Sequence, residues 1–440
     1  MPVDRASVYN VGVWGPEVTL GVQVASTKRL LATMIDPNPQ VPTTPYRPQG
    51  FVAATTAVQQ KESTELAVSG TMSYPDMAYL WSSLFKVGVV TTPAGATTAR
   101  RWTFSPGSTA PDTFQSYTIE KGTAAAGAER ITGCVVNDLS LRWTDRDAAL
   151  TGNMMGQQTQ EQITVTGSPT DIPAVPVDPK SVSIYVGTGF STNNVQTVTL
   201  SVTGGAATGG TFTLTFENQT TTPLAFNASA ATVQAALAAL TNLGGNVTVA
   251  GGPAPSAAFT LTFSGVLAGV NATLVTANGA ALTGPGAPYA NPTVTNTTPG
   301  SMTKLLRCLS CDFAISARYL FPFTLNDADP SWSFAVQQGV EASRATVILE
   351  HDSVSAGYMA NLRARTTLYA KIIARGAPIE TVGGVVFPYA LTLTYPFKFV
   401  DPSRQDTNGV YTSTFPMVPL YDPTFGGWLT TTVDTGFASL

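Results

Sequence analysis

Residues 134–145 (CVVNDLSLRWTD) and residues 390–401 (ALTLTYPFKFVD) carry the pattern on which the fold depends. In each stretch, apolar side chains alternate with others, which is the period of a half-buried β-strand. Each stretch also ends with an aromatic residue two positions before an aspartate. Two such strands in one chain of 440 residues suggest an internal repeat.

Further matches occur in the same order on both sides of residues 191–301. A predicted strand and short helix recur, over 66–73 and 76–85 in the first half and over 345–349 and 354–363 in the second. The other matched pairs are Leu20–Arg29 with Leu309–Arg318, Ala57–Gln60 with Ala335–Gln338, Tyr117–Gly122 with Lys371–Gly376, and Val186–Phe190 with Val433–Phe437. The sequence therefore predicts two copies of one mainly β domain, each with one short helix.

The segment between the copies has a different composition. Between Lys180 and Lys304 the only charged residue is Glu217. Residues 211–216 alternate as a strand does, and residues 230–240 predict a helix capped from Asn227–Ser229. We therefore divide the chain into domains at 1–190 and 302–440 and an inserted, nearly uncharged module at 191–301. We expect this module to be β-rich with one helix, to have its own small core and to project outward.

The composition excludes several classes of function. Only 11% of residues are charged and the net charge is −4, which argues against a basic nucleic-acid binder. A single histidine, His351, makes histidine catalysis or a multi-histidine metal site improbable, so we predict no enzyme and no cofactor or metal. Cys308 and Cys311 form a C-x-x-C motif on a predicted strand and are interpreted as structural thiols. No apolar run is long enough for membrane insertion, and no apolar leader is visible at the N-terminus.

Each copy contains one long connection, at about residues 30–56 and 319–333. We expect the prolines of the first connection to prevent regular strand pairing there. Exposed aromatic residues in such connections could stack on a sugar or a base, but contact with their own domain or a neighbouring subunit is the favoured interpretation. The candidate residues are Pro37, Pro39, Pro42, Pro45, Tyr46 and Phe51 in the first connection, and Tyr319, Phe321, Phe323 and Trp332 in the second.

These motifs resemble the major tail proteins, or tail tube proteins, of long-tailed (siphovirus-type) bacteriophages. The resemblance lies in Tyr117–Gly122 followed by Gly133–Leu141, and in Gly409–Thr412 followed by Tyr421–Pro423. The insert is similar to a module of phage and bacterial surface proteins, through Gly209–Phe216, Asn227–Leu237 and Asn246–Val249. The resemblance implies two tandem tail-tube-like β-sandwich or barrel domains.

The resemblance also implies a function in the virion. Subunits of this family form rings that stack into a tube for DNA ejection, and two copies per chain would make a homotrimer a pseudo-hexameric ring. The implied partners are further copies of the chain and the tape measure, terminator and distal tail proteins, with genomic DNA only as passing cargo. Assembly is expected in the host bacterial cytoplasm, and the two long connections are then candidate ring-stacking loops.

Two alternatives remain open at this point. The chain could be a phage or bacterial surface adhesin that binds carbohydrate through its insert, or a tail hydrolase, although no catalytic cluster supports the latter. The charge balance fits a conduit, since the first copy has 13 basic and 15 acidic residues and the second has 10 and 11. Such a surface would not grip phosphates.

Overall fold

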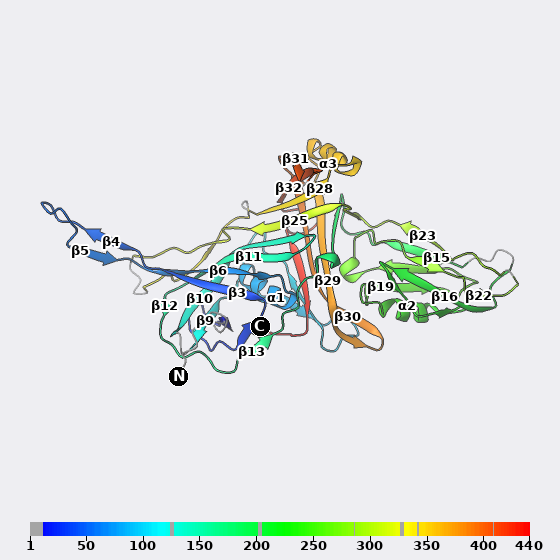
Figure 1. Cartoon of the computed structure of the whole chain (residues 1–440), viewed down its shortest axis with the longest axis horizontal. Helices are drawn as coiled ribbons and strands as arrows, with labels where there is room; N and C mark the ends of the chain where they lie inside the picture. The colour runs from blue at the N-terminus through cyan, green and yellow to red at the C-terminus, as the bar shows by residue number, and fades with distance from the viewer. Residues whose placement is uncertain are drawn as a thin grey trace.

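A computed structural model describes residues 12–123, 127–200, 205–285, 287–325, 330–340, 343–407 and 409–440. The protein is mainly β, with 49% of residues in strands, and the described part contains three α-helices. A central body carries a long two-stranded arm at one end and the insert at the other (Figure 1). None of the described helices is long and apolar enough to cross a membrane.

In its described residues, the first half of the body supplies fourteen strands and the helix α1 (Tyr74–Leu84). Its strands are β1 (Gly12–Pro16), β2 (Lys28–Leu30), β3 (Thr33–Gln40), β4 (Thr43–Tyr46), β5 (Thr56–Gln59), β6 (Ser63–Thr71), β7 (Val89–Thr91), β8 (Arg100–Phe104), β9 (Tyr117–Thr123), β10 (Gly127–Thr144), β11 (Ala148–Gly156), β12 (Thr159–Gln160), β13 (Thr170–Ile172) and β14 (Val182–Gly187), with a 3-10 turn at Pro179–Ser181.

The second half supplies the helix α3 (Ser353–Arg363) and, where its residues are described, ten strands. They are β24 (Met302–Lys304), β25 (Cys308–Ile315), β26 (Tyr319–Leu320), β27 (Val336–Gln337), β28 (Arg344–Glu350), β29 (Leu368–Val382), β30 (Val385–Phe399), β31 (Ser403–Thr407), β32 (Val410–Pro419) and β33 (Thr430–Thr435).

Strand pairing follows the same order in both halves. In the first half the antiparallel order is β3–β6–β11–β10, and in the second it is β25–β28–β32–β31. The two runs are joined where β10 pairs with β25, with Arg142 opposite Asp312. The result is one run of eight strands that begins with β3 and ends with β31. We call it the eight-stranded sheet.

The backbone gives an exact residue correspondence between the two runs. The N–H of Met72, just after β6, donates to the carbonyl of Ala148 at 2.8 Å. The N–H of His351, just after β28, donates to the carbonyl of Tyr411 at 2.9 Å. Met72 therefore corresponds to His351, and Ala148 corresponds to Tyr411.

This correspondence corrects two of the sequence matches. Residues 20–29 are mostly irregular, and the counterpart of β25 is β3 rather than Leu20–Arg29. The strand at residues 390–401 also does not end where the strand at residues 134–145 ends. The chain breaks its strand at Asp401, which has φ 37°, and continues as β31 before turning into β32. The structural counterpart of the end of β10 is therefore β31. The aromatic and aspartate residues of the second half that match in the sequence lie before β31, not in it.

The expectation that prolines prevent pairing in the first connection is also wrong. Pro37 and Pro39 lie in β3, which pairs with β6, and Pro45 lies in β4. In an antiparallel ladder, successive residues bond to opposite sides. Met72 forms its backbone hydrogen bond toward β11, which fixes the alternation along β6. In that alternation, the backbone groups of Asp36 and Asn38 bond to β6, while those of Pro37 and Pro39 face away from β6. Neither proline removes a donor that β6 needs.

The helices α1 and α3 occupy equivalent positions after β6 and β28 but differ in burial. Every residue of α1 is buried, including Trp81, which stacks on Phe85. The helix α3 begins with a capping box between Asp352 and Ser355 and keeps much of its surface exposed. It packs on the core through partly buried residues such as Tyr358. This difference leaves α3 at the top of the body in Figure 1.

The insert is a compact β module that includes α2 (Ala230–Ala238), capped by Ser229, whose side chain accepts from the N–H of Thr232. Its strands are β15 (Val195–Thr199), β16 (Gly209–Phe216), β17 (Gln219–Thr220), β18 (Leu224–Ala225), β19 (Val247–Gly251), β20 (Phe259–Phe263), β21 (Thr276–Asn278), β22 (Leu282–Thr283) and β23 (Thr293–Thr298), with a 3-10 turn at Gly265–Leu267.

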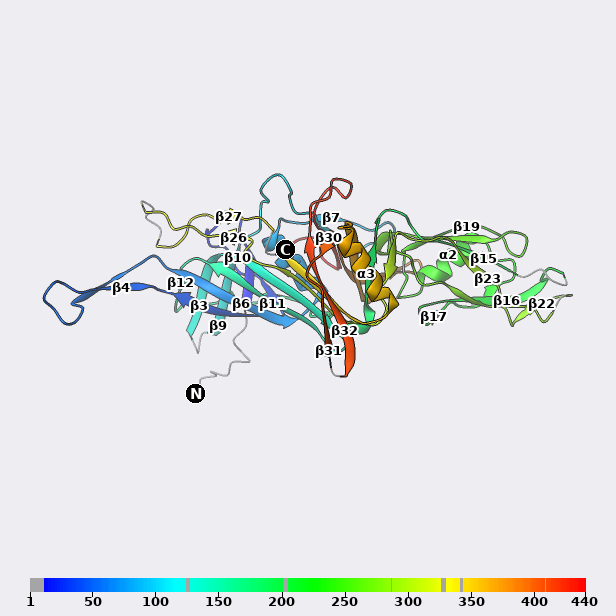
Figure 2. The same ribbon diagram turned by 90° about the horizontal axis from the view of Figure 1, so that it is seen from above.

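The insert has a buried core distinct from the main core of the body, and this core also takes in residues of the second half. Phe212, Leu237 and Phe259 of the insert belong to one buried cluster that also contains Tyr369, Ile373 and Ala390 of the second half. Burying this shared apolar surface fixes the module against β29 and β30. The insert still extends away from the eight-stranded sheet (Figures 1 and 2).

Candidate assembly surfaces and the insert anchor

One face of the eight-stranded sheet is exposed and mostly uncharged. Along β10 and β25, Leu141 and Phe313 are buried on one face, while Ser140 and Ala314 are only partly buried on the other. The same alternation runs through β6, β28 and β32. The less buried residues define what we call the polar face. Among its charged side chains are Asp36, Glu65, Arg142, Asp312, Arg344 and Glu350.

Acidic groups outnumber basic groups among the charged residues named on the polar face, and two arginines at this face lie beside acidic partners. The Nε of Arg142 lies 3.5 Å from Asp312, across the joint between β10 and β25. Near the end of β28, Glu350 pairs with Arg307 at 3.0 Å. A surface of small polar side chains with few available cations offers little affinity for phosphate groups.

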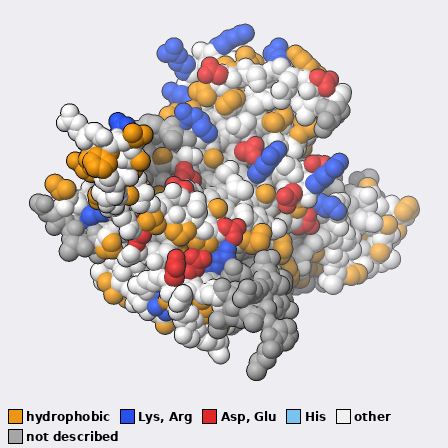
Figure 3. All heavy atoms as spheres, turned by 60° about the vertical axis from the view of Figure 1, so that its left-hand side comes forward, with side chains coloured by type: hydrophobic (Ala, Val, Ile, Leu, Met, Phe, Trp, Pro, Cys, Tyr) orange, Lys and Arg blue, Asp and Glu red, His pale blue; other side chains and the backbone are white. Residues whose placement is uncertain are grey.

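The two terminal strands of the sheet each have one unpaired edge in the described part of the chain. Strand β3 pairs only with β6, and β31 pairs only with β32. The β3 edge is partly covered by Lys121, whose Nζ donates to the carbonyl of Ile35 and pairs with Asp36 at 2.5 Å. Charged residues surround β31, and basic side chains gather at the top of Figure 3, where α3 and β31 lie. Arg404 lies in β31 itself, and Arg365 lines a pocket together with Asp401 and Pro402, just before β31.

The first connection forms a projecting arm. Strands β4 and β5 pair only with each other, and all of their residues are exposed. The arm carries apolar side chains in solvent, with Tyr46 59% exposed, Phe51 58% and Val58 61%. Isolated two-stranded hairpins are marginal in water, so an exposed apolar arm is a candidate contact for another protein.

The second connection is placed differently, because most of its aromatic residues are inside the molecule. Tyr319 and Trp332 are buried, and Phe321 packs on Trp332. The indole N–H of Trp332 donates to the carbonyl of Gly156, and the Tyr319 hydroxyl donates to the carbonyl of Leu84. These residues join the two halves of one chain. Of the second set of candidates, only Phe323, 49% exposed, remains largely on the surface.

The cysteine and histidine side chains with potential chemistry are buried or hydrogen-bonded. Cys311 is buried and Cys308 partly buried, and burial raises the pKa of the Cys308 thiol to about 12. The Nδ1 of His351 shares a 2.7 Å hydrogen bond with the Ser413 hydroxyl. Within the described residues, no group of three or more His, Cys, Asp or Glu side chains could hold a metal ion.

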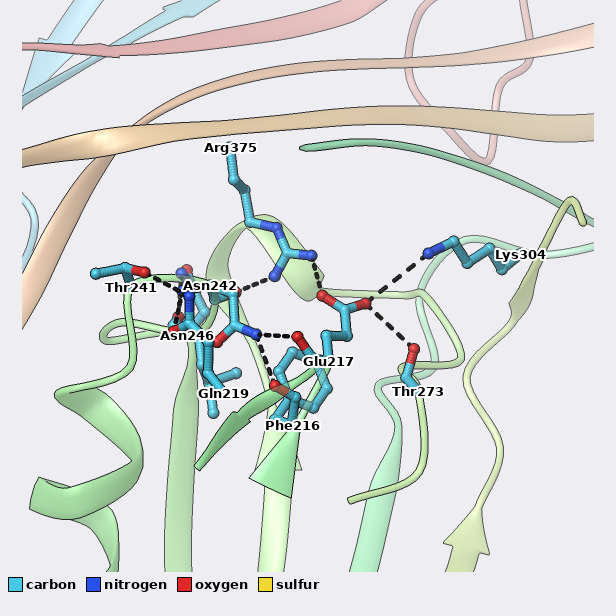
Figure 4. A network of polar contacts seen from close by, with 10 residues as sticks. Phe216, Glu217, Gln219, Thr241, Asn242, Asn246, Thr273, Lys304 and Arg375 are labelled. Carbon is cyan, nitrogen blue, oxygen red and sulfur yellow. Dashed lines mark hydrogen bonds and ion pairs between the residues drawn. The ribbon is translucent and has the colours of Figure 1, made fainter. Parts of the chain in front are cut away.

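The single charge of the insert anchors it to the second half. The Glu217 carboxylate accepts from Arg375 of β29 at 2.5 Å and lies 3.9 Å from Lys304 (Figure 4). Arg375 also donates to the carbonyl of Asn242, which in turn donates to the carbonyls of Phe216 and Glu217. The side chains of Arg375 and Glu217 are only 8% and 19% exposed. Each charge therefore needs the other to offset its desolvation.

A second cation crosses the same boundary. Lys371 of β29 is buried, and its Nζ donates to the carbonyl of Ala268 in the insert at 2.7 Å. Among the described residues, Lys371 forms no ion pair with a carboxylate. Desolvation by burial, with a smaller contribution from Arg101, lowers the pKa of Lys371 to about 8.

Sequence reasoning missed the anchor and the open edge at β31. The isolation of Glu217 in an uncharged segment was a usable signal, because a buried carboxylate needs a cation and the segment itself contains none. The β31 sequence SRQDT has no apolar alternation, so it gave no strand signal. No protein-family model matches the chain, and no curated protein matches it either.

Removing the anchor carboxylate should loosen the insert. Glu217→Ala leaves Arg375 buried without its anion, and we expect a loss of about 3 kcal/mol in the unfolding free energy of the insert. Lys304→Ala is the matched control, because that longer and more exposed contact should contribute less than about 1 kcal/mol. Hydrogen exchange of the amides of β16 and β20 measures the unfolding free energy of the insert in both variants. Equal effects of the two substitutions would contradict the anchor.

Lys371 predicts an unusual dependence of stability on pH. Its folded pKa lies below its unfolded value, so between about pH 8 and 10.5 the unfolded chain binds more protons and stability increases with pH. From pH 7.5 to 9.5 this group should add about 2 kcal/mol to the unfolding free energy. The difference between wild type and Lys371→Met, measured by urea unfolding at each pH, isolates it. A difference that does not change with pH would refute the assignment.

Proposed function

We propose that the protein is a structural subunit of a virion that polymerises into rings, and that the rings stack into a phage tail tube through which DNA passes. The observation that carries the proposal is the joint between β10 and β25. It fuses two runs of identical strand order into one sheet and leaves the corresponding edges, β3 and β31, open. An interface that joins unlike edges head to tail generates a ring when the rotation closes.

The two halves are then two tandem tail-tube-like domains, with the insert between them. Three chains would place six copies around an axis, with the polar face toward the bore. Its small polar side chains and excess of acidic groups suit a conduit, because each cation contacting a phosphate adds affinity and slows passage. The tape measure, terminator and distal tail proteins are the expected further partners, and genomic DNA is the cargo.

The insert takes the position of a decoration in this proposal. It is fixed to β29 and β30 through the shared core and Glu217, and it projects from the end of the body opposite the arm (Figure 2). Its low charge suits an outer surface that meets glycans or cell wall. A surface adhesin with the same insert would remain at a fixed small size in solution, which separates this alternative from a tube.

Concentration-dependent assembly tests the function. Purified protein should form rings of three chains at low concentration and stacked tubes at high concentration, because the open edges and the exposed arm are only satisfied by other copies. Negative-stain microscopy and light scattering measure these products. A chain that stays monomeric at all concentrations, also when seeded with preformed tail structures, contradicts the proposal.

The arm should be needed for stacking. Tyr46→Ser/Phe51→Ser removes its two large aromatic side chains without touching the body core, so rings should form but not tubes. Tyr421→Ser is the matched control, since Tyr421 is 56% exposed outside the arm. Electron microscopy of the three proteins at equal concentration gives the result. Normal tubes from the double variant would exclude the arm from stacking.

A further inference from the structure

The pairing of β10 with β25 shows how the second run of strands continues the first. Among the described residues, it leaves the outermost strand at each end of the eight-stranded sheet without a partner on one side. At this joint β25 pairs with the edge of β10 near the β10–β11 hairpin. The counterpart of β25 is β3, and the counterpart of that part of β10 is β31. Both counterparts have a free edge in the described part of the chain.

We propose that β3 of one chain pairs with β31 of the next chain, antiparallel, with Asp36 directly opposite Gln405. This inference rests on the proposed function and deepens it, because it names the strands and the register that close the ring. The partner is a second copy of this chain.

The register follows by counting from the two equivalent hydrogen bonds. Asp36 lies opposite Ala67, five residues before Met72, and Asp312 lies opposite Thr346, five residues before His351. Asp36 therefore occupies the place of Asp312.

Counting from the same two hydrogen bonds also gives the position of β31 relative to β10. Arg142 lies opposite Ala149, one residue after Ala148, and Gln405 lies opposite Thr412, one residue after Tyr411. Gln405 therefore occupies the place of Arg142. Because Arg142 faces Asp312 inside the chain, Gln405 faces Asp36 between chains.

The backbone groups of the two free edges are compatible in this register. In β31, Ser403 and Gln405 bond toward β32, so Arg404 and Asp406 present their N–H and C=O groups outward. In β3, Ile35 and Pro37 point outward. The register brings Asp406 opposite Ile35 and Arg404 opposite Pro37, so outward residues meet outward residues. Only the N–H of Pro37 is missing from the ladder.

The contact of Lys121 with β3 leaves room for a neighbour. Lys121 uses one lone pair of the Ile35 carbonyl and contacts one oxygen of Asp36. A carbonyl accepts two hydrogen bonds and a carboxylate accepts several, so Asp406 and Gln405 of a neighbour still find acceptors. Asp36 is 73% exposed in the single chain, which leaves its carboxylate accessible.

The two joints differ in the side chains that flank them, which accounts for why one is permanent and the other open. Inside the chain, buried Leu141 and Phe313 lie opposite each other. Between chains, Arg404 would lie opposite Pro37. Charged residues and prolines on sheet edges oppose indiscriminate strand addition. The open edges are therefore protected in the free chain and pair only where register and neighbouring surfaces agree.

A cysteine cross-link tests the register. Asp36 and Gln405 form a non-hydrogen-bonded cross-strand pair, whose Cα separation suits a disulfide. Oxidised rings of Asp36→Cys/Gln405→Cys should resist detergent without reductant and run as a covalent multimer. Each single variant and Gln40→Cys/Gln405→Cys, which is four residues out of register on β3, should run as single chains. The single variants also control for the native cysteines.

A backbone variant provides an independent readout. Arg404→Pro removes an outward N–H while leaving the bonds of β31 to β32, and it should reduce ring formation at least tenfold, whereas Arg404→Ala should assemble normally. A thermal melt verifies that both remain folded. Wild-type rings without the specific cross-link, together with normal rings from Arg404→Pro, would overturn the pairing and leave the proposed function standing. Wild-type protein that forms no rings would instead refute the proposed function itself.

Discussion

The ladder between β10 and β25 is the interaction on which the rest of the structure depends. It turns two runs of four strands into one continuous sheet and sets the polar face of both halves in the same direction. The buried aromatic residues Tyr319 and Trp332 then fasten the second half onto the first. Because a sheet extended in this way must end somewhere, the joint also creates two open edges.

Those edges explain several features that otherwise look like defects. Prolines at 37 and 39, the lysine contact at Ile35 and the charged β31 sequence all oppose casual strand addition. In the proposed tube, this protection would keep free chains from associating before they assemble, which matters more with only 11% charged residues overall. In the proposed assembly the same features would lower the affinity of each contact, so a stable ring would require several contacts that form together.

Much of the element order could be predicted from the sequence, because strand period and helix caps are local signals. The helices at 74–84 and 353–363 and most long strands lie near their predicted positions. The match of residues 134–145 with 390–401 was misleading, since the break at Asp401 inserts an extra strand that the alternation cannot reveal. The pairing of β3 was missed because the direction of a proline's missing N–H depends on the partner strand. Among the candidate residues, Tyr46 and Phe51 are exposed while Tyr319 and Trp332 are buried, and only tertiary contacts decide between these outcomes.

The insert shows how a module can be foreign in composition and yet structurally integrated. Its near-absence of charge means that Glu217 has no competitor inside the module for Arg375 of β29 and Lys304 of β24. One ion pair, one buried lysine contact and a shared apolar cluster therefore suffice to define its orientation. Attachment through β29 and β30 rather than through the eight-stranded sheet keeps the polar face and both open edges uncovered. In the proposed tube, an insertion at this place would add an outer surface to each chain without altering the geometry by which one sheet continues into the next.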